Sequence, residues 1–163
     1  MASTISNATL TVTVTESLTL NGSNHGSTKR IDVTGVNEVS KRIISCLTSG
    51  TQVYKGHETV ASFGQFIYGN VKYIRITNLD DTNAVTIHIE DTTNTTYAQF
   101  LIPAGHVFFL TDAAGSYGDN ATAATPTGNI ERIDALASNA TVDVELLVAV
   151  SYTHLRAHET GPY

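Results

Sequence analysis

Two histidines and a glutamate come closest, among the residues of this chain, to the types and spacing of a metal site. His88 and Glu90 lie two positions apart, and His106 begins the strand after next. Imidazole and carboxylate groups are common protein ligands of zinc and related ions. The alternation around His88, however, directs it and Glu90 to the solvent face of a hairpin. A structural cross-strand pair is the preferred interpretation, and the three residues remain weak candidates for a metal site.

Other side chains that could do chemistry lack the partners that their chemistry requires. His57-Glu58 offers a general base, but no nucleophile or orienting group is identifiable beside it. Cys46 lies in an apolar segment with no neighbour that would lower its pKa, so we expect a buried, unreactive thiol. Four aspartates could offer oxygen ligands without the spacing of a calcium loop, so turn chemistry explains them equally well: Asp80, Asp81, Asp112 and Asp119. The sequence thus predicts no catalytic residue, no cofactor and no enzymatic activity.

The elements that must position these residues are short strands. Runs such as Lys72-Tyr-Ile-Arg-Ile-Thr77 and Val85-Thr-Ile-His-Ile-Glu90 alternate with a period of two and are separated by polar turn clusters. This pattern is typical of antiparallel strands with one buried and one solvated face. No stretch supports a helix of three turns. We predict an all-β protein, an antiparallel β-sandwich of jelly-roll type with about nine or ten strands.

Three segments bear on how the strands are arranged. Residues 9–20 alternate cleanly, with threonines on one side, and the pattern breaks near Glu16. Residues 42–48 are apolar on both faces, which favours a central strand. Residues 111–128 form a long loop rich in Ala, Gly and Thr, with Tyr117 as its only large side chain. Loops of this length are uncommon in compact domains and are usually functional or disordered.

Composition and charge argue against several classes of partner. The net charge is -6, and the paired basic residues Lys29-Arg30 and Lys41-Arg42 stand beside acids, so we expect no nucleic-acid partner. No apolar run approaches the roughly 20 residues of a membrane helix, so we expect no membrane partner. The first residues lack the charged and apolar regions of a secretory signal. A single cysteine excludes an internal disulfide.

The final residues resemble a translated sequencing adapter. Residues 150–160, Val150-Ser-Tyr-Thr-His-Leu-Arg-Ala-His-Glu-Thr160, are similar at eleven positions to the translation of the adapter used in transposase-based libraries. The resemblance implies that the reading frame ran off a DNA fragment near Ala149 and that the source is an environmental sample. We therefore expect one domain, residues 1–149, and a non-native tail, residues 150–163. His154, His158 and Glu159 in this tail are not interpreted as a metal site.

A second resemblance concerns about residues 66–118. The run Phe66-Ile-Tyr-Gly-Asn-Val-Lys-Tyr-Ile-Arg-Ile-Thr-Asn-Leu-Asp80, continuing Asn83-Ala-Val-Thr-Ile-His-Ile89, resembles a hairpin of small virion proteins of marine tailed bacteriophages. Phe100-Leu-Ile-Pro-Ala-Gly-His-Val-Phe-Phe-Leu110 and the loop Asp112-Ala-Ala-Gly115 resemble the elements that follow it. The resemblance contains no catalytic motif. It implies a jelly-roll or sandwich subunit of the virion, made in the host cytoplasm, such as a capsid decoration, head-fibre or tail-associated protein.

The strand pattern and this resemblance give one expected function and two alternatives. We expect a structural virion protein that self-associates and contacts other virion proteins, with interface residues in the threonine ladder and the long loop: Thr11, Thr13, Thr15 and Tyr117. A carbohydrate- or ligand-binding module would instead need a platform of exposed tyrosines: Tyr54, Tyr68, Tyr73, Tyr97 and Tyr117. A degenerate cupin-like metal-binding protein is the other alternative. Pro103-Ala-Gly-His106 resembles the second cupin motif, but the two histidines of the first motif are not both present.

Overall fold

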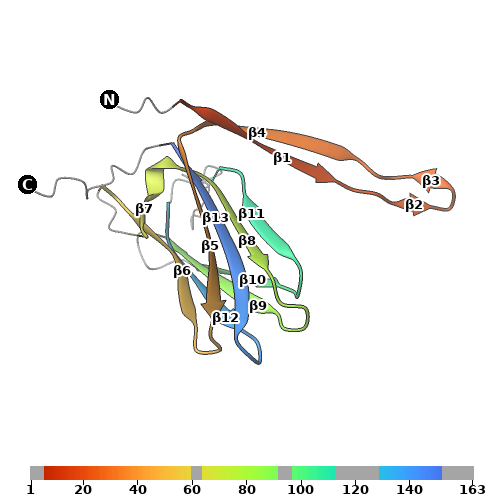
Figure 1. The fold of residues 1–163 in the computed structure, drawn as a ribbon. Coiled ribbons are helices and arrows are strands. Elements are labelled where there is room, and N and C mark those ends of the chain that lie inside the picture. Colours follow the sequence, from red (N-terminus) through yellow and green to blue (C-terminus); the bar gives the residue numbers. More distant parts are fainter. Residues whose placement is uncertain (1–5, 60–63, 92–96, 113–128, 152–163) are drawn as a thin grey trace, which may run out of the picture.

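The computed structural model describes residues 6–59, 64–91, 97–112 and 129–151. These residues form thirteen strands, one short 3-10 helix and the turns between them (Figure 1). None of these residues belongs to an α-helix, so the predicted all-β class is confirmed. The strand count exceeds the predicted one because β2, β3 and β7 are only two residues long. The elements are β1 (Ala8–Thr15), β2 (Thr19–Leu20), β3 (Ser23–Asn24), β4 (Thr28–Val36), β5 (Glu38–Cys46), β6 (Thr51–His57), β7 (Phe66–Ile67), η1 (Tyr68–Asn70), β8 (Val71–Asn78), β9 (Val85–Asp91), β10 (Tyr97–Ile102), β11 (Val107–Leu110), β12 (Ile130–Ala137) and β13 (Val142–Val150).

Two sheets face each other and form a jelly roll. The five-stranded sheet has the order β10-β9-β12-β6-β7, and the four-stranded sheet has the order β11-β8-β13-β5. All pairings are antiparallel except that of β6 with the short β7. Apart from the β9–β10 hairpin, the long strands from β5 to β13 alternate between the two sheets along the chain. This connectivity is that of a jelly roll, so the predicted sandwich is confirmed.

Aliphatic side chains from both inner faces fill the space between the sheets. β13 shows the principle, because Val142, Val144, Leu146 and Val148 are buried and alternate with less buried residues. Interdigitated side chains of this kind leave no room in the interior for polar chemistry. Other fully buried members of this core come from four more strands: Val53, Ile74, Ile76, Val85, Ile87, Ile89 and Ile133. Function must therefore reside on the outer faces, in the loops or in the N-terminal hairpin.

The N-terminal hairpin, residues 8–36, projects away from the jelly roll (Figure 1), and we call it the arm. β1 pairs with β4 along its length, and β2 pairs with β3 near the tip. Asn21 and Gly22 make the tip turn with φ values of 51° and 80°, as a two-residue type I′ turn requires. Gly35, with φ 72°, lies where the register of the β1–β4 pair shifts. Such a bulge bends the strand that contains it.

Strand β5 is an edge strand, although its apolar residues on both faces favoured a central position. It ends the four-stranded sheet and pairs only with β13. Ile44 and Cys46 contribute to the core, whereas the outward Ile43 is 64% exposed. The prediction of a central strand was wrong because the pattern records which side chains are apolar and not what covers them.

The four-stranded sheet continues slightly past the expected domain end at residue 149. Val150 is the last residue of β13, is buried, and lies opposite Val71. The backbone N–H of Ser151 donates to Asn70 O at 2.9 Å. Residues 152–163, which include most of the expected adapter-derived tail, lie outside the described residues.

Candidate interaction surface

The threonines predicted as interface residues lie together on one face of the arm. Thr11, Thr13 and Thr15 are all exposed, and they alternate with half-buried apolar residues. The Thr11 hydroxyl donates to Asp32 Oδ1 at 2.8 Å, and Arg30 Nε donates to the same oxygen at 2.9 Å. The hydrogen bond from Arg30 is the main reason why the pKa of Asp32 is lowered. This polar face is thus hydrogen-bonded across the hairpin itself.

The opposite face of the arm is apolar. Directly opposite residues of antiparallel strands share a face, so the register of β1 and β4 brings five apolar side chains together. These residues define the apolar stripe of the arm: Leu10, Val12, Val14, Ile31 and Val33. Nearer the tip, Leu18 and Leu20 are 54% and 55% exposed. An isolated two-stranded hairpin is marginally stable in water, so a hairpin with this composition needs a surface on which its apolar face can pack.

The base of the arm finds such a surface on its own jelly roll. Val33 and Val36 are buried against Tyr73 and Ala149 on the outer face of the four-stranded sheet. Tyr73, one of the tyrosines that a carbohydrate platform would need to expose, belongs to this outer cluster and is only 4% exposed. Burial here raises the pKa of the Tyr73 phenol. The partly buried residues that complete the cluster are Leu10, Val12, Phe109 and Leu147.

The remaining part of this outer sheet face is open and partly apolar. Its central charge is Glu145, which pairs with Lys41 at 2.8 Å and also with Arg75. The hydrogen bond from Lys41 is the largest cause of the lowered pKa of Glu145. Cross-strand pairing with Ala149, Glu145 and Thr77 places three half-exposed apolar side chains on the same face. We call them the open face: Val39 (51% exposed), Ile43 (64%) and Val107 (50%).

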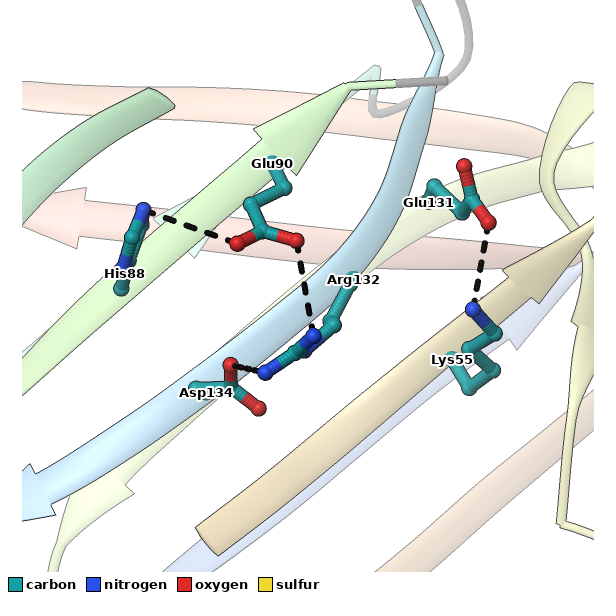
Figure 2. A network of polar contacts seen from close by, with 6 residues as sticks. All are labelled: Lys55, His88, Glu90, Glu131, Arg132 and Asp134. Atoms are coloured by element: carbon teal, nitrogen blue, oxygen red, sulfur yellow. Dashed lines mark hydrogen bonds and ion pairs between the residues drawn. The ribbon is translucent and has the colours of Figure 1, made fainter. Parts of the chain in front are cut away.

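The outer face of the five-stranded sheet carries a network of charges instead (Figure 2). Glu90 on β9 lies 3.9 Å from His88 Nε2 and 3.8 Å from Arg132 on β12. Arg132 also pairs with Asp134, and the hydrogen bond to Asp134 raises its pKa. The alternation therefore placed His88 and Glu90 on the correct face. Their neighbours there are an arginine and a carboxylate of the adjacent strand.

A β-bulge extends this network toward β6. Lys55 Nζ on β6 lies 3.1 Å from Glu131 Oε1 on β12, as Figure 2 shows. The register of β12 against β9 shifts between Ile130 and Arg132. As a result, the consecutive residues Glu131 and Arg132 are both partly exposed, where strict alternation would bury one of them.

His106, the third weak metal candidate, lies in the exposed turn between β10 and β11. Its Nδ1 is 2.8 Å from Ala104 O, so the ring is engaged with its own turn. Within the described residues, no three His, Cys, Asp or Glu side chains are grouped so that they could hold a metal ion. These residues therefore supply no ligand set on which a cupin-like reaction could be built.

Two of the five tyrosines that a carbohydrate platform would need are buried in the described part of the chain. Tyr54 is 1% exposed and stacks on Phe66 with ring centroids 5.4 Å apart. Tyr73 is covered by the arm. Tyr117 and the side chain of Tyr97 lie outside the described residues. Two of the five candidate tyrosines are thus structural.

Cys46 is fully buried, as its apolar segment predicted. Burial, together with the charge of Asp143, raises the pKa of the thiol to about 11. At neutral pH such a thiol stays protonated and is a poor nucleophile.

Asn78 joins the ends of several strands and was not singled out in the sequence. It is 1% exposed. Its Nδ2 donates to the carbonyl oxygens of Asn83 at 2.9 Å, Ile102 at 3.1 Å and Pro103 at 3.2 Å. Its Oδ1 accepts from the backbone N–H of Asp80 at 3.0 Å. An asparagine directly before a polar hairpin loop is the local signal that could have identified this role.

Asp80, one of the calcium candidates, serves the same loop. Its Oδ1 accepts from the backbone N–H groups of Asn83 at 2.5 Å and Thr82 at 2.8 Å. These two hydrogen bonds, first that of Asn83, lower the pKa of the carboxyl group. The carboxylate therefore acts as a loop cap, which is the turn chemistry that the sequence allowed.

Comparison of the chain with protein-family models, with curated proteins and with solved structures gave no match. The part of the chain that the structure describes contains no helix with the length and apolarity needed to cross a membrane. A functional interpretation therefore depends on the arm and on the sheet face beside it.

Proposed function

We propose that this chain is a non-enzymatic structural subunit of a bacteriophage particle, either a capsid decoration protein or a head- or tail-fibre component. It acts by self-association and by contacts with other virion proteins. The observation that carries the proposal is the projecting arm, because only its base is packed on the jelly roll. An exposed hairpin with an apolar stripe is unfavourable in an isolated molecule and useful in an assembly.

The sequence resemblance of residues 66–118 to small virion proteins supports the same assignment. Jelly rolls also occur in lectins and cupins, so the fold alone does not decide among the three functions. The described residues favour the first function. Tyr54 and Tyr73, which a carbohydrate platform would need, are buried. Of the weak metal candidates, Glu90 pairs with Arg132 and His106 contacts Ala104 of its own turn.

Analytical ultracentrifugation of the full chain across a wide concentration range tests this proposal. We expect an oligomer that dissociates on dilution. Co-sedimentation of the chain with tailed phage particles from marine samples tests the virion assignment separately. A strict monomer that also fails to co-sediment with any particle would refute the proposed function, and specific signals on a glycan array would favour the carbohydrate-binding alternative.

A further inference from the structure

We infer that the arm of one chain docks on the open face of a second copy, and that two copies exchange their arms reciprocally. This inference rests on the proposed self-association and adds to it the partner and the contact surface. The contact is formed by Val14 and Ile31 of the apolar stripe with Ile43 and its neighbours on the four-stranded sheet.

The first support is that the stripe already binds this kind of surface. Its base, at Val33, packs on the outer face of the four-stranded sheet through Tyr73 and Ala149. Among the described residues, the packed cluster ends at Val12 on β1. The next apolar residues of the stripe are Val14 and Ile31, and the same sheet face continues beside the cluster as the open face. The uncovered part of the stripe and the open face therefore both adjoin the existing contact between the arm and the sheet. A second copy of the chain presents the same two surfaces.

The second support comes from the edge strand β5. Edge strands in soluble proteins usually present charged residues to solvent. β5 presents one charge, Lys41, on its outer side, but on either side of it stand Val39 and Ile43, both more than half exposed. Its apolar residues on both faces, which favoured a central strand, are consistent with a strand that is covered on both sides in the assembled protein.

Charge on the two surfaces is also complementary. Lys29 stands opposite Val14 and therefore shares the face of the stripe. Asp143 alternates with buried residues of β13 and therefore lies on the outer sheet face, where the neighbouring Glu145 is already paired with Lys41 and Arg75. Opposite charges at the edge of an apolar contact select the partner and its orientation.

The size of the arm explains why the exchange is reciprocal. From Thr13 to the tip turn at Asn21 the arm extends by eight residues, about 26 Å at roughly 3.3 Å per residue. With a width of about 10 Å for two strands, docking one face removes about 500 Å² from solvent on the two partners together. Specific interfaces bury at least roughly 1,000 Å². One arm is too small, whereas two exchanged arms reach this size in a two-fold symmetric dimer.

Matched pairs of variants in the full chain test the contact by analytical ultracentrifugation. Val14→Asp places a charge on the stripe, and Thr13→Asp places the same charge one residue earlier on the polar face. Ile43→Asp charges the open face, and Leu101→Asp charges an equally exposed apolar residue of the other sheet, since both positions are 64% exposed. All four positions are at least partly exposed, and circular dichroism checks that each variant is folded.

We expect Val14→Asp and Ile43→Asp each to raise the dissociation constant of the dimer at least about tenfold, because each places an unpaired carboxylate in an apolar contact. Thr13→Asp and Leu101→Asp should leave it unchanged. Mixing the Val14→Asp and Ile43→Asp chains should restore a weak heterodimer that can be cross-linked, since one intact arm then meets one intact open face. Direct arm-to-arm pairing gives no such rescue.

The outcomes separate this inference from the proposed function. A wild-type dimer that is unaffected by Val14→Asp or by Ile43→Asp overturns the docking inference and leaves self-association intact. A dimer that is disrupted by Leu101→Asp places the contact on the other sheet and also overturns it. A wild-type monomer that co-sediments with phage particles shows that the arm has a different partner, whereas a monomer that binds no particle removes both proposals.

Discussion

Replacing Asn78 tests whether this buried amide fastens the β8–β9 loop to the turn after β10. In Asn78→Ala, the carbonyl oxygens of Asn83, Ile102 and Pro103 and the N–H of Asp80 lose their side-chain partner. The amide nitrogen carries two hydrogens, so three acceptors share two donors. The change therefore removes the equivalent of three hydrogen bonds.

The magnitude follows from which of these groups water can reach. The carbonyl of Ile102 belongs to a buried residue, and leaving it unpaired costs about 1–3 kcal/mol. The groups of Asp80 and Asn83 lie in a partly exposed loop and regain part of their hydration, so each contributes about 0.5–1 kcal/mol. We expect a loss of about 2–5 kcal/mol in the free energy of unfolding, which lowers Tm by roughly 5–15 °C for a domain of this size.

Asn78→Asp sharpens the test. A carboxylate oxygen in the place of Nδ2 would face three carbonyl oxygens, so only the protonated form of the acid is tolerated there. The pKa of the new carboxyl group in the folded state is then raised above its unfolded value. For such an acid, the destabilisation is largest above the folded-state pKa and decreases as the pH falls through it. We therefore expect Asn78→Asp to be less stable than Asn78→Ala at pH 7, and the difference to shrink in acid.

Urea denaturation followed by circular dichroism measures these changes, at one fixed protein concentration because self-association would otherwise alter the apparent stability. Asn24→Ala is the matched control. Its Oδ1 accepts from the backbone N–H of Gly26 at 2.8 Å on the exposed arm, and its loss should cost less than about 0.5 kcal/mol. If Asn78→Ala is no more destabilising than this control, or if Asn78→Asp and Asn78→Ala are equally stable at pH 7, the assigned role of Asn78 is wrong.

Three further predictions concern the arm, the core and the open face. Gly22→Ala forces an alanine into φ 80°, and because no atom lies within 4 Å of the added Cβ, backbone strain is its only effect. Amide exchange in the arm should accelerate about fivefold without a change in Tm. The control Gly69→Ala is equally uncrowded and lacks a positive φ, so it should leave exchange unchanged. Cys46, with its pKa raised to about 11, should not react with Ellman's reagent at pH 8 until the protein is unfolded, and prompt labelling of the native chain would contradict its burial. Because the folded-state pKa of Glu145 lies below its ordinary value of 4.5, the stability from its pairing with Lys41 is present above that value and is lost as the pH falls through the folded-state pKa. Glu145→Gln should therefore flatten the acid limb of stability against pH, and an unchanged limb would show that the pair contributes nothing.

The alternation of apolar and polar residues was sufficient to predict the sandwich. In β13 it separates Val144 and Leu146, which are buried, from Asp143, which is exposed. The same logic placed His88 and Glu90 outside the core. Period-two patterning specifies which side chains share a face because a shift of one residue would turn the whole apolar set toward water.

The alternation of apolar and polar residues does not show which outward side chains are buried by distant parts of the chain. Tyr73 is on the outer side of β8 as its position in the strand requires, yet the arm, more than 30 residues earlier in the chain, buries it. Gly35, a residue type that is common in turns, instead lies at a bulge inside β4. Turns and bulges both use a glycine with positive φ, so the residue type alone does not distinguish a turn from a bulge.

The arm itself was present in the sequence as two separate signals. Residues 9–20 showed the alternation, and Asn21-Gly22 is the dipeptide most typical of a two-residue hairpin turn. Taken together, they predict a hairpin of which Asn21-Gly22 is the tip. What no local signal contains is whether that hairpin joins a sheet of its own chain or leaves it.

The position of β5 and the exposure of the arm have one physical explanation in common. A strand with outward Val39 and Ile43 and a hairpin with outward Leu18 and Leu20 both carry more apolar surface than an isolated edge or hairpin should. Each feature taken alone would be a liability that favours aggregation. Two surfaces of the same chemistry in one chain, with opposite charges at Lys29 and Asp143, can instead satisfy each other between copies.

On this reasoning, removing only one of the two surfaces should make the chain less soluble than removing both. Solubility of the single variants Val14→Asp and Ile43→Asp, compared with that of the double variant, measures this directly, and a double variant that is the least soluble of the three would contradict the pairing of the two surfaces.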